Sequence, residues 1–62
     1  MAAIDLFDRF VKQLTENERQ VLDRMIASCR NDLQGARSEE ARVRIAEEFI
    51  RSAHEFLRAE NG

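Results

Sequence analysis

Four arginines in the C-terminal half of the chain recur every seven residues and could bind a row of phosphate groups: Arg37, Arg44, Arg51 and Arg58. Seven residues make about two turns of an α-helix, so these side chains would share one helix face. Glutamates accompany them at i,i+4 spacing, and the expected ion pairs are Glu40 with Arg44, Arg44 with Glu48, Glu47 with Arg51, and Arg51 with Glu55. We therefore expect a solvated, self-paired face, with anion binding by the arginines as the alternative.

The single histidine could belong to a metal site, because His54 and Glu55 begin like the His-Glu-x-x-His motif of zinc proteases. The second histidine of that motif would fall where the chain has Arg58. A Glu-x-x-His metal site would need a glutamate where the chain has Arg51. We therefore predict no metal site and expect His54 to be a packing residue at the border of an apolar helix face.

The single cysteine, Cys29, cannot form an internal disulfide, and one cysteine with one histidine cannot complete a four-ligand zinc site. Ile26 and Leu33 flank Cys29 on its own helix face, whereas a reactive thiol needs exposure and a nearby positive charge. We expect a buried structural cysteine. Because the sequence also has no Gly-rich phosphate loop, no cofactor motif and no nucleophile–base–orienter set, we predict no enzymatic activity, no cofactor and no small-molecule substrate.

Apolar residues return at helical spacing in three segments, which predicts helices over about 3–14, 16–34 and 39–60. Thr15 and Glu18 have the spacing of a capping box, so the second helix should begin there. Gly35 is placed to end that helix in a left-handed conformation, and Ser38 to cap the third helix. The short connection between these helices makes them an antiparallel hairpin.

The composition indicates a single helical domain over residues 1–62. The 62 residues are 44% hydrophobic and 35% charged and include no proline, which is typical of an ordered helical protein. We predict an all-α, three-helix protein in which a short first helix covers a long antiparallel helical hairpin. A domain of this size has a thin core and commonly depends on association for stability.

Ten basic and twelve acidic residues are interspersed along the chain, so we expect neither a nucleic-acid partner nor a membrane partner. No apolar run approaches the roughly 18 residues that span a bilayer, and the N-terminus lacks the features of a signal peptide. A free thiol is typical of a reducing compartment. We expect a cytoplasmic protein.

The third helix carries the strongest indication of a partner. Its apolar side chains span an arc of about 160°, wider than the roughly 100° that faces one neighbour. The first helix is about 18 Å long against about 33 Å for the third, so we expect it to end near the level of Ser28. The apolar residues near the Gly35 turn would then lack cover and form an association interface: Cys29, Leu33, Val43, Ile45 and Phe49.

These observations favour a small non-enzymatic protein–protein interaction or regulatory module that acts through an apolar helical surface. The expected partner is a second copy, giving a helical-bundle homodimer, or a helix of another protein.

The segment Leu14-Thr15-x-x-Glu18-Arg19-x-Val21-Leu22 supports the alternative function, a small DNA- or RNA-binding transcriptional regulator. It resembles the opening of the helix-turn-helix domains of response regulators and quorum-sensing regulators. The resemblance covers about 9 of the 62 residues and implies a short helix, a tight turn and a recognition helix. The sequence departs from this pattern, because the second helix is predicted to run to about Gln34 and the next opens with Glu39 and Glu40.

Overall fold

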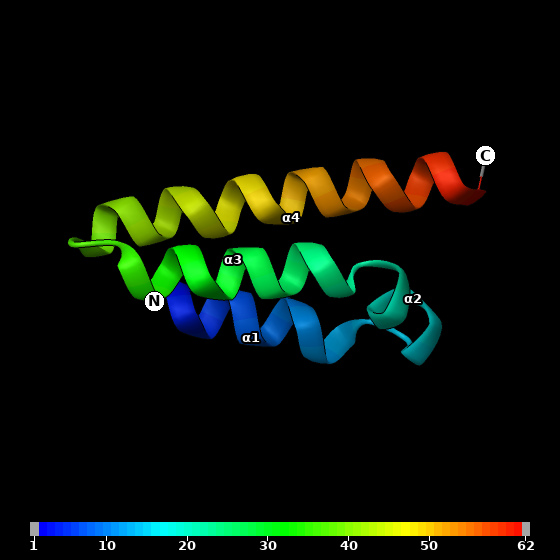
Figure 1. The fold of residues 1–62 in the computed structure, drawn as a ribbon, viewed down its shortest axis with the longest axis horizontal. Coiled ribbons are helices and arrows are strands. Elements are labelled where there is room, and N and C mark those ends of the chain that lie inside the picture. Colours follow the sequence, from blue (N-terminus) through cyan, green and yellow to red (C-terminus); the bar gives the residue numbers. More distant parts are fainter. Residues whose placement is uncertain (1, 62) are drawn as a thin grey trace.

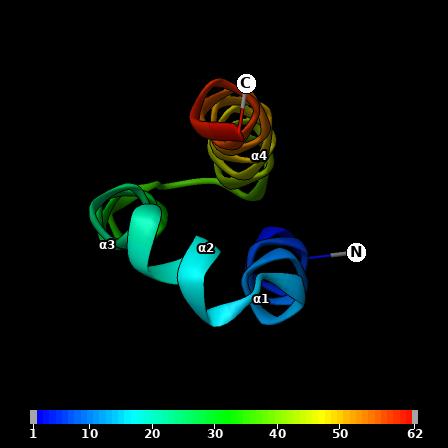
Figure 2. The same cartoon turned by 90° about the vertical axis from the view of Figure 1, so that its right-hand side faces the viewer.

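The chain is all-α, as predicted. The computed structural model describes residues 2–61, and this part of the chain holds no β-strand and four helices, α1 (Ala3–Gln13), α2 (Glu16–Val21), α3 (Asp23–Gly35) and α4 (Glu39–Asn61). Seen end-on, α1, α3 and α4 occupy three corners of a triangle, and α2 crosses from α1 to α3 (Figures 1 and 2). Within residues 2–61, no helix is both long enough and apolar enough to cross a membrane.

The predicted second helix, 16–34, is two helices in the structure, so the three-helix count is wrong. The chain bends at Leu22, whose φ of −95° and ψ of 9° lie in the sparsely allowed region between helix and strand. The Leu22 side chain is completely buried. The bend turns this side chain into the core and lets α2 leave the axis of α3, as Figure 2 shows.

The predicted caps are confirmed, but the predicted role of Gly35 is wrong. The Thr15 Oγ1 accepts a hydrogen bond from the Glu18 N–H at 3.1 Å, and Glu18 Oε1 accepts one from the Thr15 N–H at 2.9 Å. The Ser38 Oγ likewise accepts one from the Ala41 N–H. Gly35 is the last residue of α3 and has no positive φ, because the chain leaves the helix through the extended backbone of Ala36. The turn therefore does not require glycine for its backbone conformation.

The first helix reaches the Gly35 turn, which corrects the expectation that it ends near the level of Ser28. The backbone N–H of Ala3 donates a hydrogen bond to Glu39 Oε2 at 2.6 Å, so α1 begins beside the start of α4. At 1.5 Å per residue, α1 is about 17 Å long and α3 only about 20 Å. Because α2 is a separate helix, α1 has to match only the length of α3 and not that of a continuous helix of about 28 Å.

The core lies where α1 and α3 each pack against α4. The Phe7 and Phe49 ring centroids lie 5.4 Å apart, and Phe10 meets Phe49 edge-on at 5.5 Å. Ala46 and Ala53 are fully buried on α4. The Arg30 guanidinium lies 5.6 Å from the centre of the Phe7 ring and links α3 to α1 through a cation–π contact.

Glu39 fastens the start of α1 to the start of α4, and we expect Glu39→Ala to lower the free energy of unfolding by about 1 kcal/mol. Its carboxylate accepts from the Ala3 N–H and pairs with Arg42 at 3.3 Å. The side chain is 51% exposed, so solvent screens part of its charge. Urea denaturation followed by circular dichroism would measure the loss. The matched control is Glu40→Ala, which removes a neighbouring first-turn charge and should cost less than about 0.5 kcal/mol.

Candidate functional site

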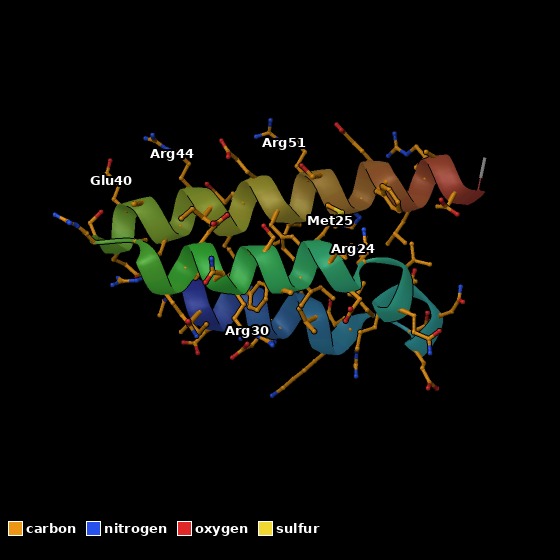
Figure 3. All side chains as sticks on the ribbon, viewed as in Figure 1. Arg24, Met25, Arg30, Glu40, Arg44 and Arg51 are labelled. Carbon is orange, nitrogen blue, oxygen red and sulfur yellow. The ribbon has the colours of Figure 1, made fainter. Side chains whose placement is uncertain are left out.

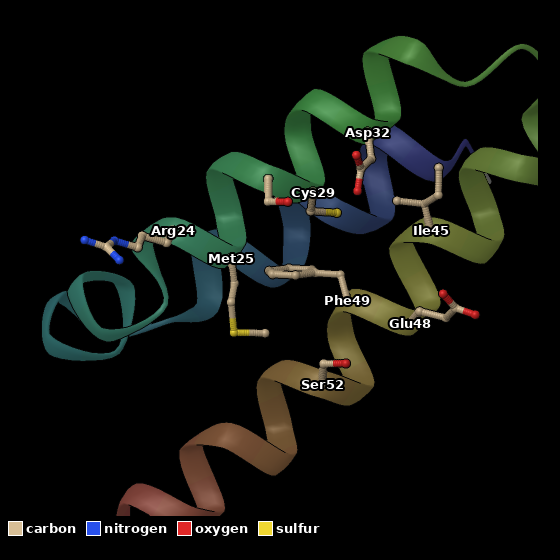
Figure 4. Close-up of a pocket in the computed structure, with 9 residues that line it drawn as sticks. Arg24, Met25, Cys29, Asp32, Ile45, Glu48, Phe49 and Ser52 are labelled. Carbon is tan, nitrogen blue, oxygen red and sulfur yellow. The ribbon is translucent and has the colours of Figure 1, made fainter.

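A groove open to solvent runs between α3 and α4 on the side away from α1. Its floor is apolar and is formed by Met25, Cys29, Ile45 and Phe49, and its rim is formed by Arg24, Ser28, Asp32, Glu48 and Ser52. Figure 4 shows the floor side chains between the two helices and the charged groups at the edges. The groove has a volume of about 380 Å³, near the small end of the range for small-molecule pockets, and it is open to solvent.

The groove continues toward the C-terminal end of α4. A second hollow shares Arg24 and Met25 with the first and adds Val21 and Phe56 to its lining. Phe56 is 42% exposed and Val21 is 37% exposed. The C-terminal turns of α4 extend beyond the start of α3, which leaves this end of the apolar surface with the least cover (Figure 1).

The five predicted interface residues differ in burial and in whether they line the groove. Cys29, Ile45 and Phe49 line the groove, whereas Leu33 and Val43 do not. Cys29, Leu33 and Phe49 are buried within the single chain, and Val43 and Ile45 are half-buried. The expectation that these five residues lack cover is therefore wrong for the three buried ones, because α1 extends to the turn. Ile45 is the member that is both half-buried and in the groove.

Three apolar residues of the groove are outside the predicted interface: Val21, Met25 and Phe56. A signal for them exists in the sequence, because each wall of the groove has residues spaced four, three and four apart. On one wall these are Val21 at the end of α2 and Met25, Ser28 and Asp32 on α3, and on the other they are Ile45, Phe49, Ser52 and Phe56 on α4. This is the spacing of a helix–helix seam. Met25 is half-buried and packs at the open edge of the core.

The arginine stripe does not form the predicted intrahelical pairs. Within residues 2–61, the structure has one ion pair, between Arg42 and Glu39, and none of the four predicted pairs is close enough to count as one. Arg44 and Arg51 extend away from the body of the protein, as does Glu40 (Figure 3). These charged side chains are solvated rather than joined to one another, which leaves them able to pair with groups outside the chain.

His54 packs against α1, as expected of a border residue, although it is exposed. Its ring centroid lies 5.4 Å from that of Phe10, in an edge-on arrangement. Across the described part of the chain, no three His, Cys, Asp or Glu side chains gather closely enough to hold a metal ion.

Cys29 is buried, as predicted, with 5% of its surface exposed. Burial disfavours the charged thiolate and, with a smaller contribution from the nearby Asp32 carboxylate, raises the pKa of the thiol from 9.0 to about 11. The thiol is therefore protonated at neutral pH, which is the opposite of what a nucleophilic cysteine needs.

The raised pKa of Cys29 predicts a loss of stability in alkaline solution. Folding favours the neutral thiol, and this preference contributes to the free energy of unfolding. The contribution is fully present below pH 9 and is lost as the pH rises through about 11. We expect the free energy of unfolding to fall by about 2 kcal/mol over this range. Urea denaturation at pH 8 and pH 11 measures the change. The chain has no tyrosine, so few other groups titrate there.

The matched control for the alkaline loss is Cys29→Ala. Alanine has no ionisable group, so this variant should be less stable at pH 8 but should lack the part of the alkaline loss that the thiol causes. An equal loss in both proteins would show that another group is responsible.

Comparison of the chain with protein-family models, with curated proteins and with solved structures finds no match. The geometry of the groove is therefore the basis on which a function is proposed.

Proposed function

We propose that the protein is a small non-enzymatic protein–protein interaction module whose binding surface is the groove between α3 and α4. The observation that supports this most strongly is the continuous apolar floor, which stays open along its length and ends at the exposed Val21 and Phe56. An apolar surface rimmed by polar groups is typical of a protein-binding site. A groove of this shape buries side chains from a surface laid along it better than it encloses a small molecule.

A helix is the partner element that fits best. Both walls of the groove are helices, and both present residues at the spacing with which side chains of neighbouring helices interlock. An amphipathic helix lying along the groove would contact both walls at once. The rim carries both signs of charge, and a phosphate backbone in the groove would meet the carboxylates of Asp32 and Glu48. This favours a protein partner over a nucleic acid.

Photo-crosslinking in the cell of origin tests the proposal. A photoreactive residue in place of Ser52, on the groove rim, should crosslink to a protein. The same residue in place of Glu47, which is exposed and outside the groove, should not. Adding Ile45→Glu to the Ser52 probe should abolish the crosslink while circular dichroism shows that the helices persist.

Equal crosslinking from both positions, or crosslinking that Ile45→Glu leaves unchanged, would contradict the proposal. The mass of the crosslinked product distinguishes the partners, because a second copy adds 7.2 kDa and a foreign protein adds its own mass.

A further inference from the structure

We propose that the groove is closed by the same groove of a second copy, turned end for end, so that α4 lies antiparallel on the partner's α4 and α3 on the partner's α3. This inference rests on the proposed function and names its partner. The two-fold axis would cross the groove at the level of Ser28 on α3 and between Phe49 and Ile50 on α4. Ser28 and Phe49 line the same groove, which places both points in one surface.

The order of charges on α4 selects this arrangement. Beside the seam formed by Ile45, Phe49, Ser52 and Phe56 lies a line of alternating charges, Arg44, Glu48, Arg51 and Glu55. Antiparallel pairing about the point between residues 49 and 50 brings together residues that lie at equal distances on either side of this point. The numbers of two facing residues therefore add to 99. Arg44 then faces the partner's Glu55, and Glu48 faces the partner's Arg51. All four contacts of this line in a symmetric dimer are therefore between opposite charges.

A parallel dimer would not have this property. In a parallel pair related by a two-fold axis, each residue lies beside its own counterpart, so arginine would face arginine and glutamate would face glutamate. The absence of Arg44, Glu48, Arg51 and Glu55 from the ion pairs of residues 2–61 leaves these groups able to pair across an interface. Arg44 and Arg51 already extend into solvent in Figure 3.

The charges on α3 follow the same symmetry. Arg24 and Asp32 lie on the groove rim at equal distances along the chain from Ser28. The axis that crosses the groove at Ser28 would bring Arg24 to the partner's Asp32 and Asp32 to the partner's Arg24. Figure 4 shows Arg24 and Asp32 at opposite ends of this surface. The charges on α3 and those on α4 are thus complementary about the same two-fold axis.

A second copy placed by the same axis would cover the exposed apolar side chains. Phe49 would lie near its counterpart at the axis, and Phe56 would come within one helical turn of the partner's Ile45. Ser28 and Ser52 are small and lie between the larger side chains of the seam, which allows the helices to approach closely. Phe56, the most exposed phenylalanine of the described chain, would then be buried at the ends of the interface.

Charge reversal tests the pairing, with the dimer dissociation constant measured by sedimentation equilibrium and light scattering. Glu48→Arg places like charges at both 48–51 contacts of a symmetric dimer, and Arg51→Glu does the same with the opposite sign. Each variant alone should dimerise at least about tenfold more weakly than the native chain. Mixing the two variants restores opposite charges at both contacts, so the mixture should form a heterodimer of nearly native affinity.

The matched control is Glu47→Arg. Glu47 and Glu48 both lie three or four residues from Arg44 and Arg51 within the helix, so either reversal has the same intrahelical cost. Only position 48 lies on the groove. The control should leave the dissociation constant unchanged, and circular dichroism should show native helicity in all three variants.

Two results would overturn the inference. One is a native chain that remains a monomer of 7.2 kDa at about 200 µM, which would leave the proposed function to be decided by crosslinking to a foreign protein. The other is a dimer that neither Glu48→Arg nor Arg51→Glu weakens, or that their mixture does not restore, because association would then use a different surface or axis.

Discussion

Replacing Phe7 with alanine is expected to lower the free energy of unfolding by about 3–5 kcal/mol. The Phe7 side chain is completely buried, its ring lies 5.4 Å from that of Phe49, and Arg30 sits over its face. A 62-residue domain has about 3–9 kcal/mol of total stability, so the variant should lose about a third or more of it and should lose its helices at a lower urea concentration than the native chain. Circular dichroism at 222 nm would record the loss of helix.

Ile4→Ala provides the control for Phe7, because Ile4 lies one turn earlier on α1 and is 45% exposed. This variant should lose less than about 1 kcal/mol and keep native helicity. A similar loss for both substitutions would contradict the burial of Phe7 as the cause, because alanine is the better helix former at both positions.

Local features of the fold were predictable because neighbouring residues determine them. The capping box of Thr15 and Glu18 needs only a side-chain oxygen and a backbone N–H three residues away, and both of its hydrogen bonds are present. The burial of Cys29 followed from its position between Ile26 and Leu33 on one helix face. Helical periodicity also located α1 and α4 to within two residues at each end.

The break at Leu22 was not predictable in the same way. The segment around it contains neither glycine nor proline, so local propensity favours one continuous helix. We attribute the break to tertiary packing, because the Leu22 side chain at the bend is completely buried. Tertiary packing therefore decides the local geometry, and the position of α1 depends on that geometry.

The prediction of one continuous second helix also affected the predicted interface. Apolar periodicity shows that α4 has two flanks to cover, but not which flank α1 fills or how far along it reaches. With α1 placed too far from the Gly35 turn, Leu33 and Val43 were expected at the interface, and Val21 and Phe56 were not. In the structure, Ala3 reaches Glu39, and the exposed apolar surface lies along the groove and toward the other end of α4.

Leu22→Ala is the second substitution with a large expected effect, a loss of about 2–5 kcal/mol in the free energy of unfolding. Leu22 is completely buried where α2 meets α3, so alanine leaves a cavity at the junction. The backbone of Leu22 already takes part in helical hydrogen bonds on both sides, from the Leu22 N–H to Glu18 O and from the Ile26 N–H to Leu22 O. Alanine keeps these bonds, so the loss should come from packing alone.

The matched control is Val21→Ala at the preceding residue, which is 37% exposed and should cost less than about 1 kcal/mol. Urea denaturation of both variants separates burial from helix propensity, because alanine is the better helix former at either position. If Leu22→Ala were as stable as the native chain, the bend would not depend on burying this side chain. Helices α2 and α3 could then join into one, and α1 would no longer reach the start of α4.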